Sequence, residues 1–159
     1  MERIYVIDDE PFYVDSLCKA VGSIEFLEIM GSSFFIDIAL TEIPHLGITI
    51  LMTDIRMPYR ADGLTFIKKV KQISPKINVI AFTHEIYPSL LNDMKSGNWQ
   101  GLIHKRDIST ETIILACNSV KKGKIYHSEI ISEYKVKIQK QNIIFAPSEI
   151  EIFPYLYKG

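Results

Sequence analysis

Residues 48–54 (ITILMTD) form a short apolar run that ends in a single carboxylate, Asp54. Three other runs share this design, an apolar segment followed at once by polar residues: residues 3–9 (RIYVIDD), 77–83 (INVIAFT) and 102–105 (LIHK). A parallel sheet that is covered on both faces requires nearly continuous apolar strands of this kind. The four runs therefore predict buried parallel strands, and a less distinct strand is expected at residues 26–30.

Helical patterns separate these runs. Two of them have signals at both ends. Asp62 is expected to cap a helix that Pro75 stops, and Ser109 is expected to cap a helix that Gly123 ends. Both helices carry apolar residues at helical spacing, which predicts that each packs one face against the sheet.

Three further helices have weaker signals. Pro11 suits the first turn of a helix that Asp9 could cap. The others are expected at residues 34–43, before Pro44, and at residues 87–95. Strand and helix thus alternate about five times, which predicts an open α/β sheet with helices on both faces. Right-handed crossovers bring the carboxyl ends of the strands to one edge, where such sheets carry their chemistry.

The residues that end the four runs therefore converge at this edge. Carboxylates crowded together raise one another's pKa unless a cation neutralises them. Oxygen ligands of this kind favour Mg²⁺. A nearby ammonium and hydroxyl would stabilise the oxygens of a phosphoryl group during transfer to a carboxylate. The predicted set consists of Asp8, Asp9, Asp54, Thr83 and Lys105.

Each residue of this set also has a structural interpretation. Asp8 and Asp9 could cap the first helix, and Asp54 could be a turn residue. Lys105 could be a solvated loop lysine, which is the usual environment of lysine, and Thr83 an ordinary threonine at a strand end. The coincidence of all five at strand ends favours the phosphoryl site.

Five short motifs carry a resemblance to a known family. They are residues 7–10 (IDDE), 53–58 (TDIRMP), 62–63 (DG), 82–83 (FT) and 104–107 (HKRD), in family order across most of residues 1–123. The chain resembles the receiver domain of two-component response regulators. The resemblance implies a flavodoxin-like, doubly wound, five-stranded parallel sheet of order 2-1-3-4-5 with about five helices.

The resemblance also implies roles for the site residues. Asp54 would be the phosphoacceptor, and Asp9 and Asp54 would bind Mg²⁺ directly. Asp8 would act on the ion largely through water, and the backbone carbonyl of Arg56 would supply a further ligand. Lys105 would pair with the phosphoryl group, and Thr83 would swing toward it as the switch. Such a domain catalyses its own phosphorylation and dephosphorylation and is not otherwise an enzyme.

Three features depart from the family pattern. Leu102 stands where the family usually has an aromatic residue, so coupling to output is expected to be altered. His84 replaces the usual small residue after the switch threonine. Its ring could restrict access, donate to the phosphoryl group, or simply face solvent. The loop at residues 58–63 is one residue longer than usual, a change that loops tolerate.

Composition is consistent with a globular chain of ordinary size. The 159 residues are 47% hydrophobic and 23% charged, with a net charge of −1. This balance suggests neither a nucleic-acid nor a membrane partner. Cys18 and Cys117 lack metal-binding spacing and are expected to be reduced thiols in the core. Because the sequence shows no signal peptide and no apolar run long enough to span a bilayer, a cytoplasmic location is expected.

The domain boundaries are expected at residues 123 and 144. Residues 1–123 would form the receiver, and residues 124–144 a helical or mobile linker. Residues 145–159 resemble the opening of a LuxR-type helix-turn-helix domain, with Ser148 as a cap. No recognition helix follows, so DNA binding is expected only through a domain missing here, in a fragment or a naturally short chain. The alternative is a tail with one amphipathic helix.

Two functions follow from these features. In the first, a sensor histidine kinase phosphorylates Asp54, and a change in homodimer or heterodimer formation controls transcription. In the second, a degenerate receiver pairs with another regulator independently of phosphorylation, as Leu102 would favour. An aspartate-dependent phosphatase is set aside because Arg56 stands where a second aspartate is needed. A flavin protein lacks support because no phosphate-binding loop follows the first strand.

Overall fold

The computed structural model describes residues 1–57, 63–95 and 97–144, and side chains within these ranges as far as residue 141. The strands are β1 (Glu2–Ile7), β2 (Leu27–Ser33), β3 (Ile50–Asp54), β4 (Asn78–Thr83), β5 (Gly101–His104) and β6 (Tyr126–His127). The helices are α1 (Pro11–Gly22), α2 (Ile36–Leu46), α3 (Gly63–Ile73), α4 (Pro88–Met94), α5 (Thr110–Lys121) and α6 (Glu129–Ile144). A 3₁₀ turn, η1 (Lys105–Asp107), follows β5.

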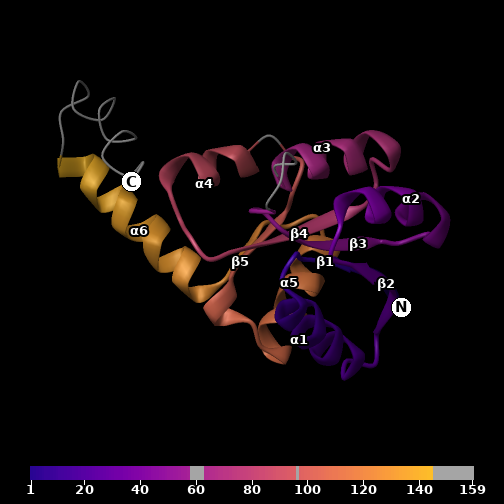
Figure 1. Cartoon of the computed structure of the whole chain (residues 1–159). Coiled ribbons are helices and arrows are strands. Elements are labelled where there is room, and N and C mark those ends of the chain that lie inside the picture. The colour runs from indigo at the N-terminus through magenta and orange to yellow at the C-terminus, as the bar shows by residue number, and fades with distance from the viewer. Residues whose placement is uncertain (58–62, 96, 145–159) are drawn as a thin grey trace.

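The strands form one parallel sheet in the order β2-β1-β3-β4-β5-β6. Helices α1 and α5 cover one face, and α2, α3 and α4 cover the other (Figure 1). The α/β fold and the order 2-1-3-4-5 are therefore confirmed. Within the described residues, the expected five strands and about five helices become six of each, because β6 extends the sheet beyond β5 and α6 follows it. Strand order reverses between β1 and β3, where such sheets carry their sites.

Side chains of β1 show why the sheet is buried on both faces. Tyr5 and Ile7 point into the layer under α2 and α3, whereas Ile4 and Val6 point into the layer under α1 and α5. All four are fully buried. Successive strand residues face opposite sides, so an unbroken apolar run fills two cores at once.

Several predicted boundaries need correction. The strand expected at residues 26–30 runs from Leu27 to Ser33. Pro44 does not end its helix, because α2 continues to Leu46 and ends at Gly47, whose φ of 59° is left-handed. Proline so close to the end of a helix interrupts few backbone hydrogen bonds. Asp9 is not the cap of α1, since Glu10 occupies that position without a side-chain cap.

Other predicted helix signals are confirmed. Ser109 precedes α5, and its Oγ accepts a hydrogen bond from the Thr112 N–H. Gly123 follows this helix with a φ of 73°. The predicted cap Asp62, the rest of the loop at 58–62, and residues 145–159 with Ser148 lie outside the described residues.

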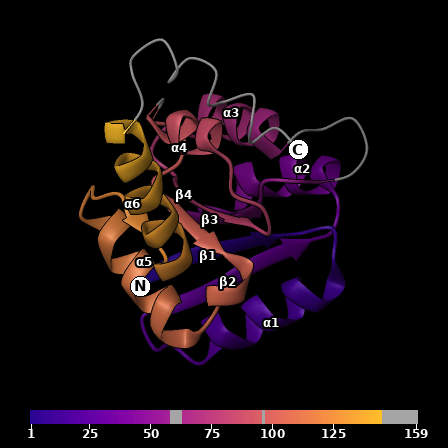
Figure 2. The ribbon, with the colours of Figure 1, turned by 90° about the vertical axis from the view of Figure 1, so that its left-hand side faces the viewer.

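The segment after α5 docks against the outer edge of the sheet. Ser128 lies between β6 and α6 and is buried. Its N–H donates to the Leu102 carbonyl, and its Oγ accepts from the His104 N–H. Figure 2 shows α6 beside the side of the sheet farthest from β2, where β6 pairs with β5. No helix in the described part of the chain is long and apolar enough to cross a membrane.

Candidate functional site

Four carboxylates meet at the carboxyl ends of β1 and β3. One oxygen from each lies within 4.8 Å of the others, in the set Asp8, Asp9, Glu10 and Asp54. Asp8 and Asp54 are buried, with 1% and 5% of their surface exposed. The strand-end positions predicted from sequence therefore bring the three aspartates together, and Glu10 joins them.

Lys105 completes the cluster from the end of β5. Its Nζ lies 2.7 Å from Asp8 Oδ2, 3.2 Å from Asp54 Oδ2 and 3.6 Å from Glu10 Oε1. The Lys105 side chain is fully buried, so the interpretation as a solvated loop lysine is wrong. A buried ammonium requires charge partners, and this one has three carboxylates.

Burial and charge shift the pKa values of these groups. Burial raises the pKa of Asp8 to about 6, against the opposing effect of the Lys105 hydrogen bond. Burial also raises the pKa of Asp54, again opposed by the Lys105 charge. Burial alone would lower the pKa of Lys105, but Asp8 and Asp54 outweigh it and the net shift is upward. The site therefore carries carboxylates that a second cation would stabilise in their charged form.

Two predicted residues lie beside the cluster in local turns. The Arg56 N–H donates to Asp54 Oδ1 at 3.1 Å, while its guanidinium pairs with Glu85 at 2.8 Å. Thr83 ends β4 and is buried. Its hydroxyl donates to the Glu85 carbonyl at 2.6 Å and accepts from the Glu85 N–H at 3.1 Å. The hydroxyl of Thr83 is therefore engaged in a turn after β4.

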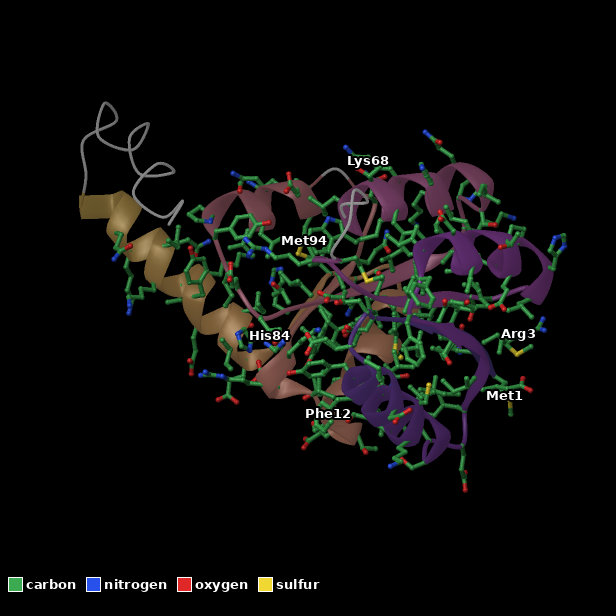
Figure 3. The ribbon with its side chains drawn as sticks, in the orientation of Figure 1. Met1, Arg3, Phe12, Lys68, His84 and Met94 are labelled. Carbon is green, nitrogen blue, oxygen red and sulfur yellow. The ribbon has the colours of Figure 1, made fainter. Side chains whose placement is uncertain are left out.

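The departures from the family pattern have distinct environments. Leu102 is fully buried in the core. His84 is half exposed, with Nε2 3.6 Å from Glu10 Oε1 and its ring edge against Tyr13 at 5.2 Å. Figure 3 labels His84, which follows β4, and Phe12, in the first turn of α1. His84 thus faces the loop after β1 rather than solvent alone.

Sequence reasoning missed three contributors. Glu10 stands in the motif IDDE, but the motif itself implies no role for this residue. The Tyr13 ring lies 4.0 Å from Lys105 Nζ, a contact that residue spacing does not reveal. Gly63 packs against the backbone of the predicted phosphoacceptor: a Cβ there would lie 2.6 Å from the Asp54 carbonyl oxygen and closer still to that of Ile55. Its place in the motif DG was the available signal.

The donor set suits Mg²⁺. Its ligands would be oxygens alone, from carboxylates gathered within one ion's reach. Asp8 Oδ2 is buried and lacks a hydrogen bond of regular geometry, its close partner being the Lys105 ammonium. The residues present therefore form an acidic group that could hold a divalent ion.

This geometry has a family counterpart. The model of the response regulator receiver domain matches residues 4–117. The chain belongs to the response regulator receiver family. The matched range contains all the residues of the acidic cluster and Lys105.

Sequence relatives refine the type of receiver. The chain is 27% identical to the transcriptional regulatory protein RcsB of Salmonella typhi over 162 residues, covering 99% of this chain and 74% of that protein. Identity to RcsB of Escherichia coli K12 is 26% over the same length and coverage. These relatives support the predicted LuxR/NarL-type assignment within two-component systems.

Solved structures agree with these relatives. The receiver resembles the isolated REC domain of RcsB from Salmonella enterica serovar Typhimurium, solved with the phosphomimetic BeF₃⁻. Its TM-score is 0.74 at 25% identity, covering 83% of this chain and 96% of that one. An RcsB–DNA complex gives a TM-score of 0.78 at 25% identity, covering 95% of this chain and 74% of that one.

Proposed function

We propose that this receiver accepts a phosphoryl group on Asp54 from a sensor histidine kinase in the cytoplasm and thereby controls transcription. The observation that carries the proposal is the buried Lys105 ammonium, 3.2 Å from Asp54 Oδ2 amid the cluster of carboxylates. The RcsB receiver solved with a phosphomimetic supports it by analogy. The protein would act catalytically only on its own phosphorylation and dephosphorylation.

The transfer itself needs one nucleophile and a positioned cation. The Asp54 carboxylate attacks phosphorus, the N–P bond of the phosphohistidine breaks, and its electron pair remains on the imidazole nitrogen. Lys105 stabilises the charge of the phosphoryl oxygens, and the Arg56 N–H holds the Asp54 carboxylate in place. Asp8, Asp9, Asp54 and the Arg56 carbonyl would hold Mg²⁺, which when bound neutralises charge at the site.

The switch would begin at Thr83. Its hydroxyl now bonds to the backbone of Glu85 at both donor and acceptor positions. To donate to a phosphoryl group on Asp54, it must leave this turn, and the loop that carries His84 and Glu85 must rearrange. The resulting change in homodimer or heterodimer formation is the proposed output. DNA contact would belong to a LuxR-type domain C-terminal to the receiver.

One observation favours a second function. Leu102 is fully buried and has no polar tip that could find a new partner when Thr83 moves. A receiver without that coupling could pair with another regulator whether or not Asp54 is phosphorylated.

One experiment distinguishes the two functions. The protein is incubated with acetyl phosphate and Mg²⁺, then divided between intact-mass measurement and size-exclusion chromatography. The leading proposal predicts a phosphoryl adduct that is absent in Asp54→Asn and in EDTA, with a change in elution volume. No adduct, or an equal adduct on Asp54→Asn, contradicts phosphoacceptor function. An adduct without any change in elution supports the second function.

A further inference from the structure

The Lys105 ammonium has an aromatic partner besides its carboxylates. The centroid of the Tyr13 ring lies 4.0 Å from Nζ. Because the Lys105 side chain is fully buried, this contact is desolvated, and cation–π attraction is strongest under that condition. The ring is therefore one of four groups that determine where the ammonium lies.

The position of Tyr13 is itself well defined. It lies in the first turn of α1, where Pro11 restricts the backbone and the Tyr13 N–H donates to the Glu10 carbonyl at 3.0 Å. The centroid of the Tyr13 ring lies 5.3 Å from that of Phe12 and 5.2 Å from that of His84, both in edge-to-face geometry. Tyr13 thus links the loop after β1 to the loop after β4 across Lys105.

The chemistry of the site favours an uncharged partner for the Lys105 ammonium. The site already gathers four carboxylates, and an incoming phosphoryl group is also an anion. Another carboxylate near Lys105 would repel that group and compete for the ammonium, whereas an aliphatic side chain would offer no attraction. An aromatic face attracts the cation and adds no net charge.

We propose that Tyr13 is a positioning residue for phosphoryl transfer, whose ring face holds the Lys105 ammonium beside Asp54. The inference rests on the proposed phosphoacceptor function. During transfer Lys105 turns from carboxylate oxygens to phosphoryl oxygens, and the Tyr13 ring is the partner that stays unchanged. Tyr13 acts through Lys105 and takes no part in bond making.

The rate of phosphorylation tests this role. Parent, Tyr13→Phe and Tyr13→Leu proteins are incubated with acetyl phosphate and Mg²⁺, and the phosphoryl adduct is followed by intact mass. Tyr13→Leu is expected to be about tenfold slower than the parent, while Tyr13→Phe, which keeps the ring face, stays within about twofold. Phe35→Leu, which changes an exposed ring on another loop, serves as the matched control and matches the parent. The proposal is overturned if Tyr13→Leu reacts at the parental rate or if Tyr13→Phe is as slow as Tyr13→Leu.

A second measurement does not depend on phosphorylation. The ring current of Tyr13 should shift the Lys105 ε-methylene protons upfield in NMR spectra of the parent and Tyr13→Phe, but not of Tyr13→Leu. Equal shifts in all three proteins would overturn the contact. Emission from Trp99, the single tryptophan and fully buried, confirms that each variant is folded. A parent with the NMR signature but no adduct would refute the proposed function while keeping the Tyr13–Lys105 contact.

Discussion

The carboxyl end of β5 and its outer edge lead into regions of different character. At its carboxyl end, Lys105 enters the acidic site, which we define as Asp8, Asp9, Glu10, Asp54 and Lys105. Along its outer edge lies the C-terminal extension, which we define as β6 and α6 (residues 126–144). The family model covers the acidic site but ends at residue 117, before the extension. The family model therefore spans the acidic site alone, whereas the matches to RcsB cover 99% of the chain and include the extension.

The two regions are joined by residues that flank Lys105. The His104 N–H donates to Ser128 Oγ at 2.9 Å, and Asp107 Oδ2 accepts from the Ile130 N–H in the first turn of α6 at 2.9 Å. His104 Nδ1 accepts from the Arg106 N–H, so Nε2 carries the proton and donates to the His84 carbonyl at 3.0 Å. A site built from strand ends that are distant in sequence thus meets the extension at a few hydrogen bonds from backbone N–H groups to side-chain oxygens.

The largest effect is expected from removing the charge in the acidic site. Lys105→Gln leaves buried Asp8 and Asp54 without their ammonium and removes the cation that faces the phosphoryl group. Phosphorylation by acetyl phosphate should slow by on the order of 10²-fold. The initial rate of adduct formation measures this. If the variant is phosphorylated at the parental rate, Lys105 has a structural role only and does not contribute to phosphoryl transfer.

The next largest effect, on stability, is expected where Gly63 lies close to the backbone of Asp54 and Ile55. Gly63→Ala places a Cβ 2.6 Å from the Asp54 carbonyl oxygen, which should destabilise the fold by about 2 kcal/mol. Gly22→Ala is the matched control, because a Cβ there meets nothing within 4 Å. Urea unfolding followed by Trp99 emission compares the two. Equal free energies of unfolding for both variants would contradict the close approach.

The pH dependence of the free energy of unfolding, measured without metal, tests the protonation of Asp8. Burial raises its pKa to about 6 from an ordinary value of 3.8, so the folded protein retains a proton that the unfolded chain has lost. The free energy of unfolding should therefore fall as pH rises from about 4 to about 6, by up to about 1.4 kcal/mol per pH unit. Asp8→Asn should lack this component. Urea unfolding in EDTA at several pH values measures it, and parallel profiles for the two proteins would refute it.

The smallest effect is expected in the extension. Ser128→Ala leaves the buried His104 N–H without its acceptor, at a cost of about 1 kcal/mol. Hydrogen exchange should increase in α6, while the phosphorylation rate stays within about twofold of the parent. A loss of phosphorylation comparable to that of Lys105→Gln would show that phosphoryl transfer at the acidic site depends on the extension.

The acidic site was largely predictable because its residues end strands. Asp8, Asp54 and Lys105 follow apolar runs directly, and parallel strands bring such ends to one edge. Tyr13 was not predictable, because its contact with Lys105 joins the first turn of α1 to the residue after β5, and these segments are far apart in the sequence. The motif DG signals Gly63, but the close backbone approach that requires glycine there is visible only in the structure.

The fold was predictable to the extent that its signals were long or repeated. Near-continuous apolar runs identified β1, β3, β4 and β5, while the two residues Tyr126–His127 are too few to show any periodicity. Pro44 predicts a helix end, but α2 continues to Leu46, because a proline so near the end of a helix interrupts few backbone hydrogen bonds. Local signals thus located most elements, and packing against the sheet determined the rest.

We propose that Asp54, and no neighbouring carboxylate, receives the phosphoryl group. The most direct measurement is to phosphorylate the protein with acetyl phosphate and Mg²⁺, reduce the acyl phosphate with borohydride, and locate the modified residue by peptide sequencing. The reduced residue is expected at position 54, with Asp8, Asp9 and Glu10 unmodified. Modification at one of those three residues with Asp54 intact would contradict it.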